Sequence, residues 1–174
     1  MIPVKSVYLL TGMPGTGKTS LIKEITEEMG GRAGGFYTEE VRAGGVRQGF
    51  RIVALDGQTA GLAHISTRSP HRVSKYGVDI EGLERVGVTA LQRAAEEADI
   101  IVIDEIGKME LLSENFKTTV LEIIESGKKA LGTIMLKSDP WVDMIKKKPQ
   151  VQIITLNRNN RQEVRDKIME WIKG

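Results

Sequence analysis

The segment Gly12-Met-Pro-Gly-Thr-Gly-Lys-Thr19 constrains the fold more than any other stretch of this chain. Its glycines crowd a bend where few side chains could fit. The spacing of glycine, four residues, glycine, lysine and threonine turns successive backbone N–H groups toward one anion. A nucleoside triphosphate is the ligand that this spacing predicts. The nucleotide-binding residues expected in the loop are Gly12, Met13, Pro14, Gly15, Thr16, Gly17, Lys18 and Thr19.

The sequence on either side of the loop has the order that phosphate binding requires. Residues 5–11 form a short apolar run typical of a strand, and apolar residues recur at helical spacing behind the loop. We therefore expect Lys18 to act catalytically by stabilising charge on the β- and γ-phosphates. Thr19 is expected to offer its hydroxyl to the magnesium ion of a bound nucleotide.

A second chemical signal lies at residues 99–110. Four apolar residues, Ile100 to Ile103, predict a strand buried on both faces, with Asp104 and Glu105 at its carboxyl end. Ligands of parallel sheets bind at that end. Asp104 is expected to hold Mg²⁺ together with Thr19, and Glu105 to orient or deprotonate the attacking water. The alternative is that Glu105 begins the next connection as a solvated acid.

Length and composition limit the kind of protein that carries these motifs. The 174 residues suit one compact domain, and a net charge of +2 gives no footprint for nucleic acid. The absence of cysteine excludes disulfides and fits a reducing cytosol. No apolar stretch approaches membrane-spanning length. We expect a cytoplasmic protein without a membrane partner, and we favour a monomer.

Strand and helix patterns alternate along most of the chain, which predicts a mainly parallel sheet covered on both faces. Residues 34–65 interrupt the alternation with two turn signals and are expected to form an antiparallel meander insertion. Residues 66–76 are polar and basic, and we expect an exposed loop that could close as a lid. The other expected elements are helices over 83–98, 111–124, 141–147 and 161–172, and strands over 99–104, 130–135 and 151–156.

Several further stretches resemble the thermophile-type P-loop nucleoside triphosphatases, a family that includes the human cancer-related nucleoside triphosphatase. They are residues 35–42 (GFYTEEVR), 49–50 (GF), 76–79 (YGVD), 102–110 (VIDEIGKME), 131–134 (LGTI) and 160–161 (NR). The resemblance runs from Tyr8 to the last helix. It implies a three-layer, RecA-like P-loop fold and magnesium-dependent hydrolysis of several nucleoside triphosphates to diphosphates. It also implies a second nucleotide-contacting segment, made of Ile100, Ile101, Val102, Ile103, Asp104, Glu105, Ile106 and Gly107.

Two other functions fit parts of the sequence. A small-molecule or nucleotide kinase could use the meander and the basic loop, with Arg72 and Lys75, to bind a phosphoryl acceptor. A slow GTPase-like switch would use Asp104 and Gly107, but no Asn-Lys-x-Asp element for guanine is present. Thr133 could contact the water or the γ-phosphate, or serve packing alone. On the resemblance, Asn160 and Arg161 are placed near the base.

Overall fold

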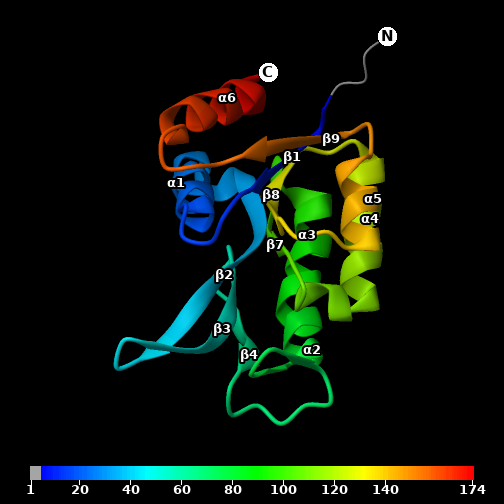
Figure 1. The fold of residues 1–174 in the computed structure, drawn as a ribbon. Helices are drawn as coiled ribbons and strands as arrows, with labels where there is room; N and C mark the ends of the chain where they lie inside the picture. Colours follow the sequence, from blue (N-terminus) through cyan, green and yellow to red (C-terminus); the bar gives the residue numbers. More distant parts are fainter. Residues whose placement is uncertain (1–4) are drawn as a thin grey trace.

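The computed structural model describes residues 5–174, and in them nine strands join one sheet in the order β5-β6-β4-β3-β2-β7-β8-β1-β9 (Figure 1). The strands are β1 (Val7–Thr11), β2 (Ala33–Ala43), β3 (Val46–Ala54), β4 (Thr59–His64), β5 (Arg72–Val73), β6 (Tyr76–Val78), β7 (Ile100–Ile106), β8 (Ala130–Ile134) and β9 (Val151–Thr155). The helices are α1 (Lys18–Met29), α2 (Ile80–Gly82), α3 (Thr89–Glu97), α4 (Glu114–Ser126), α5 (Pro140–Lys146) and α6 (Arg161–Lys173), with the tighter or wider turns η1 (Gly30–Arg32), η2 (Leu83–Val88) and η3 (Glu110–Leu112).

The parallel half of the sheet contains β2, β7, β8, β1 and β9. Strand β8 lies between β1, which precedes the glycine loop, and β7, which carries Asp104 and Glu105. Parallel strands bring their carboxyl ends to the same edge, so the two motifs meet there. The predicted α/β class with a P-loop type of parallel sheet is confirmed.

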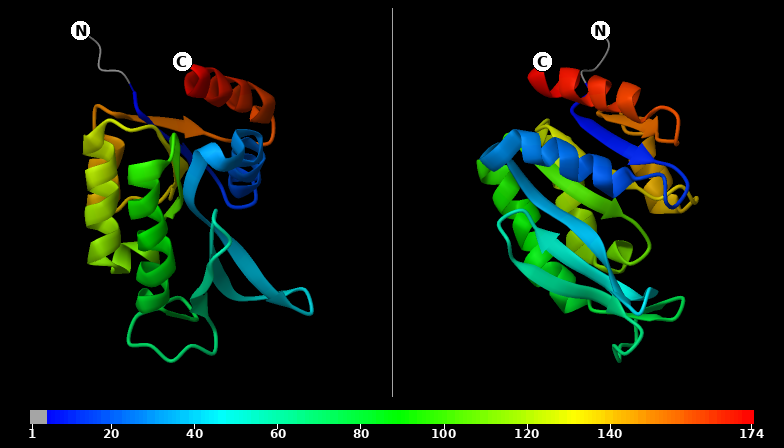
Figure 2. Two further views of the ribbon diagram at one scale, coloured as in Figure 1. Left: turned by 180° about the vertical axis from the view of Figure 1, so that it is seen from behind. Right: turned by 90° about the vertical axis from the view of Figure 1, so that its left-hand side faces the viewer.

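Helices cover both faces of this parallel half, which gives the expected three layers (Figure 2). Alternate residues of β7 serve the two cores, because successive strand side chains point to opposite faces. Ile100 and Val102 pack in one core with apolar residues of α1 and α6, while Ile101 and Ile103 pack in the other with residues of α3, α4 and α5. The strand is therefore buried on both sides, as its apolar run predicts.

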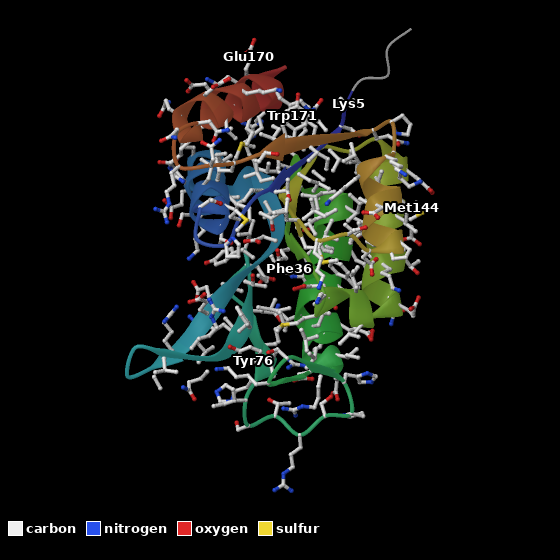
Figure 3. The ribbon with its side chains drawn as sticks, viewed as in Figure 1. Lys5, Phe36, Tyr76, Met144, Glu170 and Trp171 are labelled. Carbon is white, nitrogen blue, oxygen red and sulfur yellow. The ribbon has the colours of Figure 1, made fainter. Side chains whose placement is uncertain are left out.

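Strand β2 belongs to both parts of the sheet, because its first residues are parallel to β7 and its later residues are antiparallel to β3. This corrects the expected start of the insertion at residue 34. Residues 33–36 of β2 pair in parallel with β7, and the same strand then pairs antiparallel with β3. Gly35 permits this approach: its φ is +111°, and a Cβ there would lie 2.1 Å from the carbonyl oxygen of Val102. Figure 3 shows Phe36 where the two halves meet.

The segment 66–76 is only partly the loop that its composition predicts. Arg72–Val73 forms β5, which pairs with β6 through a turn at Ser74. Tyr76 is buried and packs edge-to-face on Phe50, with ring centroids 5.4 Å apart (Figure 3). The aromatic contact anchors the carboxyl end of the segment to the sheet. Residues 66–71 and the turn at residues 74–75 lie outside regular strands.

Among the elements expected over residues 83–172, two helices and one strand differ from the expected boundaries by two residues or more, and the others by one at most. The helical segment near residue 83 begins earlier, at Ile80, because the carboxylate of Asp79 accepts the N–H of Gly82 at 2.9 Å. Helix α4 begins at Glu114 rather than 111, because the Ser113 hydroxyl accepts the N–H of Phe116 at 3.0 Å. Strand β7 continues through Ile106. Within residues 5–174, no helix has the length and apolar character needed to span a bilayer.

Candidate active site

The glycine loop lies between β1 and α1, at the carboxyl edge of the parallel half (Figure 1). Gly12, Gly15 and Gly17 have φ values of +147°, +80° and +88°, a region that side chains other than glycine rarely occupy. A Cβ on Gly12 would lie 2.5 Å from the carbonyl oxygen of Leu156, the residue that follows the neighbouring strand β9. Glycine is therefore required both by conformation and by space at the start of the loop.

Lys18 is the first residue of α1, and its side chain folds back across the loop. The Nζ atom donates to the carbonyl oxygens of Gly12 at 2.8 Å and Met13 at 3.1 Å. The Thr16 hydroxyl also donates to the Met13 oxygen, at 3.0 Å. These contacts place a positive charge beside the helix N-terminus, where an anion is favoured.

Asp104 lies in β7 and is only 2% exposed. Its Oδ1 accepts a hydrogen bond from the hydroxyl of Thr133 in β8 at 2.6 Å, whereas its buried Oδ2 has no hydrogen-bond partner among the described residues. Burial raises the pKa of Asp104, while Thr133, Thr19 and Lys18 act in the lowering direction. The carboxylate thus has one oxygen held in place and one available for a ligand.

Two further acids adjoin Asp104. Burial and the negative charge of Asp104 raise the pKa of Glu105, and Lys18 partly opposes that shift. Glu110 in η3 is 3% exposed, and burial and the charge of Glu105 raise its pKa well above the ordinary glutamate range. The sequence assigned Glu110 no role, because a glutamate in a polar turn is usually solvated.

A cavity of about 700 Å³ joins the loop to these carboxylates. Its walls bring together Lys18, Thr19, Asp104, Glu105 and Thr133, four of which the sequence predicts as site residues. Another wall comes from the β2–β3 hairpin, to which the sequence assigned a role only in the kinase alternative. The hairpin residues that line the cavity are Thr38, Glu39, Glu40, Arg47 and Phe50.

Arg47 is the positively charged residue among the hairpin residues that line the cavity. Its guanidinium pairs with Glu40 and lies 5.2 Å from the centre of the Phe50 ring. Its Nε is buried and has no hydrogen-bond partner within residues 5–174. Arg51, on the same strand, pairs instead with Glu39 at 2.6 Å and is not among the cavity residues.

Other predicted residues lie elsewhere. Ile100 to Ile103 are buried in the two cores and do not line the cavity. The side chain of Asn160 closes the turn before α6, donating to the Thr155 oxygen at 2.8 Å. Arg161 donates to the Gly17 carbonyl at 3.3 Å and so contacts the loop from behind. Neither Arg72 nor Lys75 is part of the wall that the described residues form.

The profile of a family described as NTPase matches residues 7–169. This chain belongs to that family. It is 48% identical over 165 residues to the nucleoside-triphosphatase THEP1 of Thermotoga sp. strain RQ2, covering 95% of this chain and 94% of that protein. It is 40% identical over 169 residues to THEP1 of Methanocaldococcus jannaschii, covering 94% and 98%.

The fold of this chain is also similar to the folds of solved structures. The crystal structure of THEP1 from the hyperthermophile Aquifex aeolicus superposes with a TM-score of 0.89 at 36% identity, over 97% of this chain and 99% of that one. The solution structure of a human cancer-related nucleoside triphosphatase gives 0.80 at 34% identity, over 98% of both chains. The family resemblance expected from the sequence is confirmed.

Proposed function

We propose that this protein hydrolyses the terminal phosphoanhydride of ATP, GTP, CTP, UTP and related nucleoside triphosphates to a diphosphate and phosphate. The observation that carries the proposal is the cavity where Lys18 and Glu105 face the same space. A lysine that neutralises phosphate charge and a carboxylate that accepts a proton are the two groups that hydrolysis at the γ-phosphorus needs. The names of the THEP1 relatives agree with this reaction.

The residues present fit a magnesium ion delivered with the nucleotide. The unpartnered Oδ2 of Asp104 and the hydroxyl of Thr19 are oxygen donors beside the phosphate loop. Within residues 5–174, no cluster of three or more acidic, histidine or cysteine side chains could hold an ion alone. Mg²⁺ is commonly bound by one or two protein oxygens together with substrate phosphates and water. When bound, it would neutralise charge on the β- and γ-phosphates.

The protein groups then divide the reaction among them. The loop N–H groups and Lys18 bind the phosphates and stabilise negative charge as the bond to the β-phosphate breaks. Glu105 orients a water and accepts its proton, and its burial makes the carboxylate a stronger base than a solvated glutamate. Thr133 fixes the orientation of Asp104 through the 2.6 Å hydrogen bond.

Arg47 would supply a second positive charge from the same chain. Its position in the cavity wall opposite the phosphate loop lets the guanidinium approach the γ-phosphate, in competition with its partner Glu40. An arginine at that place stabilises the charge of the transition state. Arg47 would thereby supply from this chain the charge that a partner protein's arginine supplies in some other nucleoside triphosphatases.

Phosphate release from each of the four triphosphates with Mg²⁺ tests the proposed reaction. We expect specificity constants within about a hundredfold, or ~2.7 kcal/mol of discrimination, because no Asn-Lys-x-Asp element reads the base. Lys18→Ala should abolish release and leave the fold intact by circular dichroism. Release at the wild-type rate from this variant would overturn the site, and turnover of GTP alone would favour the switch-like alternative.

A further inference from the structure

A second cavity, of about 530 Å³, adjoins the first and has a different character. Its walls are mostly apolar and come from both halves of the sheet, including Phe50, Leu62, Met109, Ile134 and Leu136. Leu136 lies at the rim of this cavity and is 50% exposed. The volume lies in the range of small-molecule pockets.

The position of this second cavity relative to the phosphate loop limits what can bind there. It shares Gly12, Pro14, Lys18 and Glu105 with the loop region. The residues that face the rest of the phosphate chain, including Gly17 and Thr19, line the first cavity. In the proposed reaction Lys18 binds the β- and γ-phosphates and Glu105 holds the attacking water, and both residues line the second cavity, so this cavity adjoins the position of the nucleophile.

Hydrolysis alone does not account for a space of this size and composition. One water molecule occupies about 30 Å³ and is held best by polar partners. The cavity is far larger. Its polar lining consists of Lys18, Thr38, Glu105 and the buried Glu110, together with the exposed Lys108 and Lys137. A molecule with an apolar body, a hydroxyl and an anionic group would match the apolar walls, the carboxylate of Glu105 and the two exposed lysines, respectively.

We propose that the second cavity binds a small, apolar-bodied hydroxy acid that accepts the γ-phosphoryl group in place of water. The acceptor oxygen forms a bond to the γ-phosphorus and its proton passes to Glu105. The bond between that phosphorus and the β,γ-bridging oxygen breaks, and its electron pair leaves with the nucleoside diphosphate. The inference rests on the triphosphate site proposed above and adds a second substrate, so that hydrolysis is the reaction when the second cavity holds only water.

The test uses para-(hydroxymethyl)benzoate as the probe and para-methylbenzoate, which lacks the hydroxyl, as its control. Binding to the full chain with saturating diphosphate and Mg²⁺ is measured by ligand-observed NMR. In a reaction with a γ-labelled triphosphate, the amounts of label in inorganic phosphate and in phosphate ester are then measured separately. We expect both compounds to bind alongside the diphosphate, and an ester to form with para-(hydroxymethyl)benzoate alone.

Two matched leucine variants locate the binding. Leu136→Glu places a charge in the wall and should weaken binding of both compounds at least about tenfold. Leu112→Glu alters another exposed leucine, 37% exposed, that does not line the cavity, and should bind as the wild type does. Circular dichroism verifies that both variants fold.

Four results would overturn the inference. They are failure of both compounds to bind, their displacement by the diphosphate, release of all label as inorganic phosphate despite binding, or equal loss of binding in both leucine variants. Displacement would assign the cavity to the nucleobase. Ester formation without acceptor-free hydrolysis would instead reject the proposed hydrolase and keep the second site.

Discussion

Replacing Thr133 by valine isolates one buried hydrogen bond while preserving the shape of the side chain. The Thr133 hydroxyl donates to Asp104 Oδ1 at 2.6 Å, and the two residues are 1% and 2% exposed. Hydrogen bonds to charged groups contribute about 1.5–3 kcal/mol, and the variant leaves both carboxylate oxygens without a protein partner. We expect the free energy of unfolding, measured by urea denaturation in the presence of a metal chelator, to fall by about 2 kcal/mol.

The same substitution should weaken metal-dependent binding, because Thr133 holds Asp104 in the orientation that a metal ion would need. Loss of such a supporting contact costs about 10- to 100-fold in metal affinity or activity. Titration of Mg²⁺ at a fixed triphosphate concentration measures this. The control Thr26→Val removes a hydroxyl that donates to the Lys23 carbonyl at 2.9 Å in α1, and should leave the Mg²⁺ requirement unchanged. A Thr133→Val protein with wild-type stability and wild-type Mg²⁺ dependence would refute the reasoning.

Three other substitutions probe separate parts of the site. Arg47→Gln should lower kcat about a hundredfold in steady-state assays, whereas Arg51→Gln on the same strand should stay within about twofold; equal effects would remove Arg47 from the mechanism. Gly12→Ala, with its Cβ 2.5 Å from the Leu156 oxygen, should lower Tm and triphosphate affinity, and unchanged calorimetry would contradict the close approach. Glu110→Gln should stabilise the metal-free fold near pH 8. The folded-state pKa of Glu110 is raised, so the stabilising contribution of the protonated side chain is lost as pH rises. The stability advantage of the glutamine variant should therefore vanish toward pH ~4.5. Denaturation at several pH values measures this dependence.

The parallel half of the fold could be predicted because each of its strands and helices has a recognisable pattern in its own stretch of sequence. Residues 100–103 and 130–134 are apolar runs long enough for buried strands, and the intervening segments have helical spacing. The amino-terminal part of β2 could not be predicted in the same way. Its first residues, Ala33, Gly34 and Gly35, are small because the neighbouring backbone and α3 approach closely, and small residues give no strand signal.

The residues of the candidate site fall into the same two groups, those predicted by local motifs and those that depend on tertiary contacts. Lys18, Thr19, Asp104 and Glu105 follow from motifs whose spacing is fixed by contact with phosphate and metal. Arg47 reaches the cavity because the β2–β3 hairpin forms part of its wall, a tertiary arrangement that leaves no local pattern. The proposed closure of residues 66–76 stays a prediction, since it concerns a change between states.

Single-turnover phosphate release by Glu105→Gln, with triphosphate binding measured on the same preparation, tests the central claim most directly. Glutamine retains the size and a hydrogen-bonding oxygen but cannot accept the proton of the attacking water. We predict that binding survives while the rate falls about a hundred- to ten-thousandfold, or ~3 to 5 kcal/mol of barrier. Release at the wild-type rate would contradict the role of Glu105 and with it the proposed mechanism of hydrolysis.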